Sequence, residues 1–560
     1  MIKWFVAIAL AAASLAGVAR GAPLDVAYDI RPVLTDGALT ALAVELRFAG
    51  DEGGQTRLAI PPQTDRHPGR PDLAGLEVSG ASMTRLDATH VLLRHAPGGR
   101  ILVRYRIVSG FTGLPDQQPF RALLLPNWFA VNGERAFVRP EGRGAAAASV
   151  RFSGLPKGWT VASDLTGATV GDLDDREVIG GAGWAEVDRP IDGARLRLFY
   201  RPELAPKSVD AGAGLMARIA EASFAFWGDP AHDLFVPVIP LRSDTGGRGI
   251  RGGFVINAGP PDDLTSFGRI FAHEHGHSWI SRQIGGQPAK DSDLEAWLNE
   301  GFTDLTAARV MLAGGFWTLE DYAADLNAAL LRYGTSPVRD APNARIQAAR
   351  ATDIDVNFLA YDRGRLLGLQ WDRAFRAATR GKAGLQDVLQ RQRGDASLAK
   401  AQPAPTSADR LFPIAVREVT GLDIAPDIAR YVDAGAPIEL RADLLGECGS
   451  FQTVTQPAFD RGFDILATFR NHGQLNGLEA GGPAERAGLR DGDQIAIDEL
   501  PSHDSQRPLT YRVLAPDNSR RAVTYKPEGQ GTVSFQRFTL NPTLGEAGRE
   551  RCRRVMSGVA

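Results

Sequence analysis

The stretch FAHEHGHSWI, from Phe271 to Ile280, constrains the fold of this 560-residue chain more than any other feature. Residues four positions apart lie on one face of an α-helix, so the spacing places His273 and His277 side by side. Two imidazoles at that spacing can hold one zinc ion, and Glu274 between them can act on a water in the open coordination position. The pattern therefore predicts a helix that carries a metal site and a catalytic base.

The third metal ligand is expected in a second helical segment, DLEAWLNEGFTDLTAARV. Glu300 in this segment can supply the carboxylate of the set of two histidines and one glutamate that is typical of catalytic zinc. Asp304 falls one turn later on the same face, where it could accept the spare N–H of His273 or His277 and fix the orientation of the ring. Glu295 is the alternative third ligand, although it lies on a different face from Glu300.

The remaining histidine of the motif, His275, points away from the face that holds His273 and His277. We therefore expect His275 to be a structural histidine, or one that supports a metal ligand, rather than a metal ligand itself. A metzincin would place a histidine six residues after His277, with a glycine between. Gln283 and Ile280 occupy those two positions, so the sequence excludes that class.

Residues 1–21 have the pattern of a secretory signal peptide. Lys3 forms a short positive region, an apolar run begins at Trp4, and Ala19 and Gly21 stand at −3 and −1 if cleavage follows Gly21. An uncleaved anchor is the alternative. Because no later run reaches about 18 uninterrupted apolar residues, no stable membrane span is expected after cleavage. Export across the inner membrane would place the protein in the periplasm.

The charge and the cysteine content of the chain bear on its partners and on its compartment. The chain has 63 Lys and Arg against 66 Asp and Glu, a formal net charge of −3, which gives no reason to expect a nucleic-acid partner. Its two cysteines, Cys448 and Cys552, could pair in an oxidising compartment such as the periplasm. Two unpaired thiols are the alternative, because the sequence does not show how close their Cα atoms lie.

The pattern of the chain predicts a multidomain α+β protein. Residues 22–205 alternate as strands and predict an all-β, sandwich-like domain. Residues 206–445 begin with a helix and a short apolar strand and are then mainly helical. Strands return in residues 446–542, around the glycine-rich GLEAGGPAERAGLRDGDQIAI, and the polar residues 543–560 are expected to be a tail.

HExxH followed by WLNEGF resembles the gluzincins, the thermolysin-like zinc peptidases. Within that group the chain is most similar to the glycyl aminopeptidase family (metallopeptidase family sixty-one), which has an N-terminal β domain, a thermolysin-like catalytic domain and a PDZ domain. NWFAVNGERAFVRPEG, LPKGWTVASDL, RYVDAGAPIELRADLLGECG and the PDZ-like GGPAERAGLRDGDQI extend the resemblance over nearly the whole mature chain. It implies one zinc ion per chain, a peptide or protein substrate, and a peptide ligand for the PDZ-like domain.

The resemblance also implies a role for Tyr361. Aminopeptidases of this group have a Y-x-K-G-like motif whose tyrosine stabilises the oxyanion formed when the carbonyl is attacked. Tyr361-Asp362-Arg363-Gly364 matches it, with arginine in place of lysine. A core tyrosine on an amphipathic helix is the alternative.

The glycine-rich stretch TGGRGIRGGFVINAG departs from the family pattern. The aminopeptidases place a glutamate in this strand, where it binds the free α-amine of the substrate. Here the strand has Arg248 and Arg251 and no acid, although its edge could still hold a peptide by backbone pairing. Gly252 and Gly253 are the residues expected to contact the substrate.

The sequence therefore predicts a zinc metallopeptidase, of aminopeptidase type by resemblance. Because the glycine-rich strand lacks an acid, a zinc endopeptidase is one alternative. Asp291 or Glu295 would otherwise have to anchor the amine. A non-catalytic, PDZ-bearing binding protein with a vestigial site is the other alternative.

Overall fold

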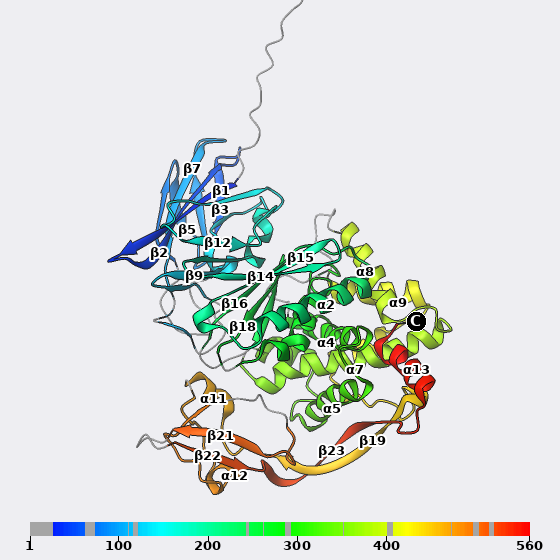
Figure 1. The fold of residues 1–560 in the computed structure, drawn as a ribbon. Coiled ribbons are helices and arrows are strands. Elements are labelled where there is room, and N and C mark those ends of the chain that lie inside the picture. The colour runs from blue at the N-terminus through cyan, green and yellow to red at the C-terminus, as the bar shows by residue number, and fades with distance from the viewer. Residues whose placement is uncertain are drawn as a thin grey trace, which may run out of the picture. The chain divides into compact units, whose positions relative to one another are not determined.

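The computed structural model describes residues 26–61, 73–109, 111, 113–115, 121–241, 246–260, 262–285, 293–350, 352–399, 407–471, 473–496, 503–514 and 520–559 (Figure 1). The predicted signal peptide and Asp291 lie outside these residues. The chain forms two compact units, one from residues before 111 with 133–157 and 165–174, the other from 111–132, 158–164 and 175 onward. Within the described ranges, no helix has the length and apolar character needed to cross a membrane.

The first unit is built mainly from strands, in line with the alternating sequence. Its elements are β1 (Val26–Thr35), β2 (Ala38–Ala49), β3 (Gln55–Ala59), β4 (Leu73–Ser79), β5 (Ser82–Arg85), β6 (His90–Arg94), β7 (Arg100–Ile107), α1 (Gly133–Ala136), β10 (Arg139–Pro140) and β11 (Ala148–Phe152). They form sheets of order β11-β1-β2-β7-β4 and β10-β3-β6-β5. From Leu42 to Phe48, every second side chain of β2 is buried, so one face of this part of the strand lies in the core.

The second unit begins with two further sheets. Their strands are β8 (Leu123–Leu125), β9 (Trp128–Asn132), β12 (Thr160–Ser163), β13 (Glu177–Gly181), β14 (Ala185–Ile191), β15 (Ala194–Tyr200), β16 (Leu234–Ile239), β17 (Gly246–Ile250) and β18 (Gly253–Asn257). One sheet has the order β12-β13-β9-β8, and the other has the order β14-β15-β16-β18-β17. The glycine-rich strand β17 therefore ends the five-stranded sheet, where it pairs antiparallel with β18.

Strands β14 and β15 depart from the expected domain organisation. The sequence places them at the end of the N-terminal β domain, but β15 pairs in parallel with β16 and so joins the next sheet. Leu196 and Leu198 face the core of the helices, whereas Phe199 packs on the other side of the sheet with Phe235. A strand with apolar residues on both faces indicates a buried strand, yet it does not indicate which sheet the strand joins.

Helices form most of the rest of the second unit. They are α2 (Val209–Trp227), α3 (Gly268–Gly276), α4 (Ala296–Ala313), α5 (Leu319–Thr335), α6 (Asn343–Ala349), α7 (Ile354–Ala378), α8 (Leu385–Ala399), α9 (Ala408–Thr420) and α10 (Ala425–Asp427). Local signals set where several begin: Thr318 and Asp321 form a capping box at the start of α5, and Asp353 caps α7. One continuous core joins these helices to the sheet that ends in β17.

The backbones of α4 and α7 touch where a glycine of each helix meets. A Cβ atom added to Gly364 would lie 1.6 Å from the carbonyl oxygen of Trp297, and one added to Gly301 would lie 2.4 Å from the Cα atom of Gly364. Any larger side chain at these positions would force the helices apart. Glycine is therefore required here for close approach, and not for a turn.

The region after α10 contains a long two-stranded ribbon and a small domain (Figure 1). Its elements are β19 (Gly449–Phe459), α11 (Ile465–Arg470), α12 (Pro483–Arg486), β20 (Gln494–Ala496), β21 (Leu509–Leu514), β22 (Arg520–Tyr525) and β23 (Glu528–Leu540). The ribbon of β19 and β23 packs along α5, where Asn327 exchanges hydrogen bonds of 2.8 and 2.7 Å with the backbone of Phe538. The small domain has a separate core that includes Leu489, Tyr511 and Val523.

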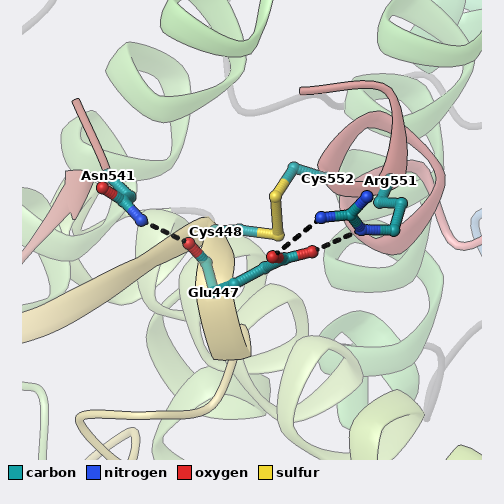
Figure 2. Close-up of a disulfide and its surroundings, with 5 residues drawn as sticks. All are labelled: Glu447, Cys448, Asn541, Arg551 and Cys552. Carbon is teal, nitrogen blue, oxygen red and sulfur yellow. Dashed lines mark hydrogen bonds and ion pairs between the residues drawn. A yellow bond between two sulfur atoms is a disulfide. The ribbon is translucent and has the colours of Figure 1, made fainter. Parts of the chain in front are cut away.

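The last residues form the helix α13 (Glu546–Ser557), where the sequence predicts a polar tail. Cys552 and Met556 lie four positions apart on its buried face, a stripe too short to stand out in a segment rich in arginine. Cys552 forms a disulfide with Cys448, with 5.4 Å between the Cα atoms (Figure 2). Arg551 beside it donates two hydrogen bonds, of 2.7 and 3.0 Å, to Glu447.

The disulfide should contribute measurably to stability. It closes a loop with a sequence separation of 104 residues, and removing such a bond typically costs about 2–5 kcal/mol. We expect the double variant Cys448→Ser/Cys552→Ser to lower the Tm measured by calorimetry by roughly 2–5 °C. Arg551→Ala removes only the neighbouring exposed ion pair and should change the Tm little. Equal Tm values for the double variant and the wild type would contradict the prediction.

The contact of α4 and α7 provides a second test. We expect Gly364→Ala to destabilise the protein by about 1–3 kcal/mol or more, because the added methyl group overlaps the backbone of α4. Gly394→Ala on α8 is the control, since the nearest atom to its added Cβ is an arginine nitrogen 3.7 Å away. Alanine in an open helical position should be neutral or stabilising. Urea unfolding curves that rank the two variants in the reverse order would overturn this account.

Candidate metal centre

Helix α3 divides its histidines between two environments. His275 lies in an aromatic core, with ring-centroid distances of 5.1 Å to Phe224 and 4.9 Å to Trp279. Burial lowers the pKa of His275 to about 3, so its ring is neutral at physiological pH. His273 on α3 and His277, the residue that follows the end of α3, face α4 with ring centroids 4.9 Å apart. The helix thus uses one histidine for packing and presents the other two to the site.

Glu300 on α4 completes a group of three possible metal ligands. Its Oε2 lies 3.3 Å from Nε2 of His273 and 3.4 Å from Nε2 of His277, and one ligand atom from each residue falls within 4.8 Å of the others. Among the described residues, this buried oxygen has no regular hydrogen-bond partner beyond its contacts with the two imidazoles. Two imidazoles and a carboxylate that converge on one point are a donor set typical of catalytic zinc. The residues fit a zinc ion.

Each of these three side chains is also held at its outer atom. Asp304 lies 3.5 Å from Nδ1 of His273, and Ser281 Oγ lies 3.1 Å from Nδ1 of His277. Arg350 donates a hydrogen bond of 2.7 Å from Nη2 to Oε1 of Glu300. Such partners fix the orientation of a ligand and, for histidine, its tautomer.

Two arginines hold Asp304 in its charged form. Burial alone would raise the pKa of Asp304, but Arg269 and Arg365 hold it well below its usual range. Arg365 Nη1 lies 3.0 Å from the Asp304 carboxylate and also pairs with Asp325. The charged carboxylate of Asp304 in turn favours the protonated, positively charged form of His273. Burial lowers the pKa of His273, but hydrogen bonds to Asp304 and Glu300 outweigh it and raise the value to about 10.

Glu274 is oriented by the glycine-rich strand. The backbone N–H of Gly249 in β17 donates a hydrogen bond of 2.7 Å to Oε2 of Glu274. A Cβ added to Gly249 would lie only 3.1 Å from the backbone oxygen of Glu274, so glycine lets β17 pass close to α3. The candidate base is therefore anchored to the strand that ends the sheet.

Tyr361 on α7 lies against the ligands. Its ring stacks on His273, with centroids 5.7 Å apart and an interplanar angle of 25°. Burial and the carboxylate of Glu300 raise the pKa of Tyr361 well above its ordinary value, so the phenol keeps its proton at neutral pH. Arg363, which replaces the lysine of the family motif, is buried and donates a hydrogen bond of 2.5 Å to the backbone oxygen of Ala341.

The two glycines expected to contact the substrate have other roles in the structure. The N–H of Gly252 donates to Asp164 over 3.0 Å, and Gly253 pairs with a strand on each side, β16 and β17. Arg248 donates to Glu177, a carboxyl whose pKa burial raises to about 7 although the arginine lowers it. The position at the end of the sheet belongs to β17, so a peptide that pairs with this sheet would pair there.

The alternative ligand Glu295 is directed elsewhere. Its buried carboxylate accepts a hydrogen bond of 3.2 Å from the backbone N–H of Asp409, at the start of α9. The other candidate for an amine anchor, Asp291, is outside the described residues. Glu300 is the glutamate that the structure places with the two histidines.

Sequence reasoning missed the arginines of the site. Arg269 precedes the HExxH motif by one helical turn, and Arg365 follows Tyr361 by four residues, so helical spacing could have indicated both. Arg350 lies 50 residues from Glu300 and belongs to no motif, so nothing in the sequence indicates their contact.

Comparisons with known proteins agree with this architecture. No protein-family model and no curated protein matches the chain. Among solved structures, an aminopeptidase N family protein from Idiomarina loihiensis is similar with a TM-score of 0.67 and 16% identity, over 95% of this chain and 100% of that one. The chain has the fold of that protein.

Two structures from Deinococcus radiodurans are less similar. An M1 zinc metallopeptidase matches with a TM-score of 0.46 and 17% identity, over 74% of this chain and 97% of that one. A mutant of an M1 zinc metallopeptidase bound to a Tyr-Ser-Ala substrate matches with a TM-score of 0.49 and 18% identity, over 75% and 96%. The shared fold rests on the protein from Idiomarina loihiensis alone, and the activity has to be argued from the residues of the site.

Metal binding should distinguish the two glutamates. We expect Glu300→Gln to weaken zinc binding by more than the roughly 10- to 100-fold typical for loss of a partner of a ligand, because it removes a charged donor from the site. Glu295→Gln keeps an oxygen that can accept the Asp409 N–H, and should bind zinc like the wild type. Chelator competition with metal analysis measures both. Normal zinc affinity in Glu300→Gln would contradict the assignment.

Proposed function

We propose that this protein is a zinc-dependent peptidase that binds one zinc ion per chain at His273, His277 and Glu300. The observation that carries the proposal is the convergence of these three side chains around a buried carboxylate oxygen. Glu274 follows His273 on α3, and Tyr361 on α7 stacks on the ring of His273, so a candidate base and a candidate proton donor accompany the ligands. A vestigial site would not need to keep this arrangement, which argues against a purely binding protein.

When bound, zinc would supply Lewis-acid activation of the carbonyl and of the attacking water. Glu274 would accept the proton from that water and later return it to the leaving amine. Gly249 holds one oxygen of the carboxylate, which leaves the other oxygen for the proton. Tyr361, protonated at neutral pH, would donate a hydrogen bond to the oxygen that becomes negative during the attack.

We favour an aminopeptidase, and among aminopeptidases the glycyl type. The sequence resemblance supports this assignment, and the fold shared with an aminopeptidase N family protein agrees with it. An endopeptidase is the second candidate, because β17 contains no acidic residue and its Arg248 is paired with Glu177. In an endopeptidase, backbone pairing with β17 would align an internal segment of the substrate.

The proposed function includes export and a peptide-binding domain. The predicted signal peptide and the disulfide between Cys448 and Cys552 support a periplasmic location, because disulfides persist in oxidising compartments. We assign residues 446–542 to a PDZ-like domain on the sequence resemblance. A small domain with a core of its own is compatible with that assignment, and its ligand would be an extended or C-terminal peptide segment.

The test compares the wild type with Glu274→Gln at matched zinc content, on a short peptide with a free amino terminus and on the same peptide acetylated there. We expect the wild type to cleave the free peptide. Loss of the base should lower kcat/KM by about 10²- to 10⁴-fold while zinc binding is retained. Mass spectrometry of the products identifies the bond that is cut.

Each outcome of this comparison has a distinct meaning. Removal of the first residue from the free peptide alone supports an aminopeptidase whose amine anchor lies outside β17. Cleavage of the acetylated peptide supports the endopeptidase. If the zinc-loaded wild type cleaves neither peptide, or Glu274→Gln is as active as the wild type, the proposed function is wrong.

A further inference from the structure

Arg350 connects the segments that build the site. It follows the last residue of α6, and each of its three guanidinium nitrogens reaches a different residue. Nη2 donates to Oε1 of Glu300 over 2.7 Å, Nη1 to Asp293 over 3.1 Å, and Nε to Asn357 over 3.2 Å. Asn357 lies on α7, four residues before Tyr361, and Asp293 lies just before α4. The side chain is 20% exposed. Arg350 is thus held on both sides, by the helix of the third ligand and by the helix of the tyrosine.

The contact between Arg350 and Glu300 leaves one carboxylate oxygen available. A glutamate side chain has several rotatable bonds, and fixing Oε1 restricts the directions in which Oε2 can point. In this structure Oε2 points between the imidazoles of His273 and His277, 3.3 and 3.4 Å from their Nε2 atoms. The planar guanidinium is suited to this role because its donors are fixed in a fork and it remains charged at any physiological pH.

A buried ion pair elsewhere in the same unit differs from the pair of Arg350 and Glu300 in how its carboxylate is used. Arg309 and Asp372 form a fully buried pair with a hydrogen-bond distance of 2.9 Å. There, both oxygens of the carboxylate are occupied, because Oδ1 accepts from the backbone N–H of Leu385 and Oδ2 also accepts from Arg376. Both oxygens of Asp372 thus have hydrogen-bond partners, as is usual for buried polar groups. Oε2 of Glu300 has no such partner, and its neighbours at 3.3 and 3.4 Å are the two imidazoles that could share a metal with it.

We propose that Arg350 is a positioning residue that presents Glu300 to the metal and thereby sets metal affinity and the geometry of the ligand. The inference rests on the proposed function, since it concerns the same site. Arg350 acts through Glu300, and its anchors on Asp293 and Asn357 keep it from following the carboxylate if Glu300 rotates. Loss of Arg350 would leave Oε1 without its charged donor and free Glu300 to turn away.

The test measures metal binding without reference to peptide cleavage. Arg350→Gln, Arg350→Lys and Asn357→Ala are compared with the wild type in zinc affinity, by chelator competition, and in the visible spectrum of the cobalt(II) form. We expect Arg350→Gln to weaken zinc binding by about 10- to 100-fold and to change the cobalt spectrum. Arg350→Lys, which keeps the charge but not the fork, should fall between, and Asn357→Ala should have a smaller effect.

Arg345→Gln is the matched control. Arg345 lies on α6, the helix that Arg350 follows; its side chain is 52% exposed and pairs with Asp353 at 3.4 Å. Its loss should leave zinc affinity and the cobalt spectrum unchanged. If Arg350→Gln does not fold, the Arg350→Lys and Asn357→Ala variants still decide between the two outcomes.

The results separate this inference from the proposed function. Wild-type zinc affinity and cobalt spectrum in the folded Arg350 variants would overturn the role of Arg350 and leave the peptidase proposal intact. If the wild type binds zinc but cleaves no peptide, and Arg350→Gln weakens zinc binding, the proposed peptidase function is wrong and the role of Arg350 stands. A change in thermal stability alone, with metal binding unaltered, would assign Arg350 a structural role and also overturn the inference.

Discussion

The contact between the backbones of α4 and α7 at Gly301 and Gly364 determines whether a site can form. Glu300 immediately precedes one glycine, and Tyr361 lies almost one turn before the other, so the two functional side chains approach each other only as closely as the helices do. The spacing of 2.4 Å between an added Cβ and the facing Cα shows that no side chain separates the backbones there. The distances around the candidate metal position follow from this packing.

The site also depends on a balance of the charges buried around α4. Glu300 and Asp304 stand one turn apart on α4, and two carboxylates taken out of water would repel each other and favour their neutral forms. Arg269 and Arg365 compensate Asp304, while Arg350 and the two imidazoles compensate Glu300. A divalent cation at the imidazoles would take over part of that role, which is why a site of this composition suits a metal better than an empty cavity.

Sequence reasoning performs best where a motif lies on one continuous helix. The spacing of His273 and His277, the position of Glu300 and its Asp304, and the helical character of the central region all follow from residues within one or two turns. It performs less well where partners are chosen across the fold. The sequence of β15 predicts a buried strand but not its pairing with β16. Glu300, the partner of Arg350, lies 50 residues away in the sequence. The sequence does not predict α13, because the helix is held by the disulfide of Cys552 and by the buried Met556 rather than by a long apolar stripe.

The disulfide encloses everything from β19 to α13 in one covalent loop (Figure 2). The two arms of the ribbon enter and leave beside each other, since the N–H of Asn541 donates to the carbonyl of Cys448 over 3.0 Å. The small domain at the far end is therefore an insertion that begins and ends at neighbouring points of the scaffold. Exchanging such a module, or shortening it to a hairpin, would leave the chain path of the helices that hold the site unchanged and would remove the contact of 3.3 Å between His503 and Asp355 at the start of α7. The proposed peptide binding and the proposed catalysis could then change independently within one chain.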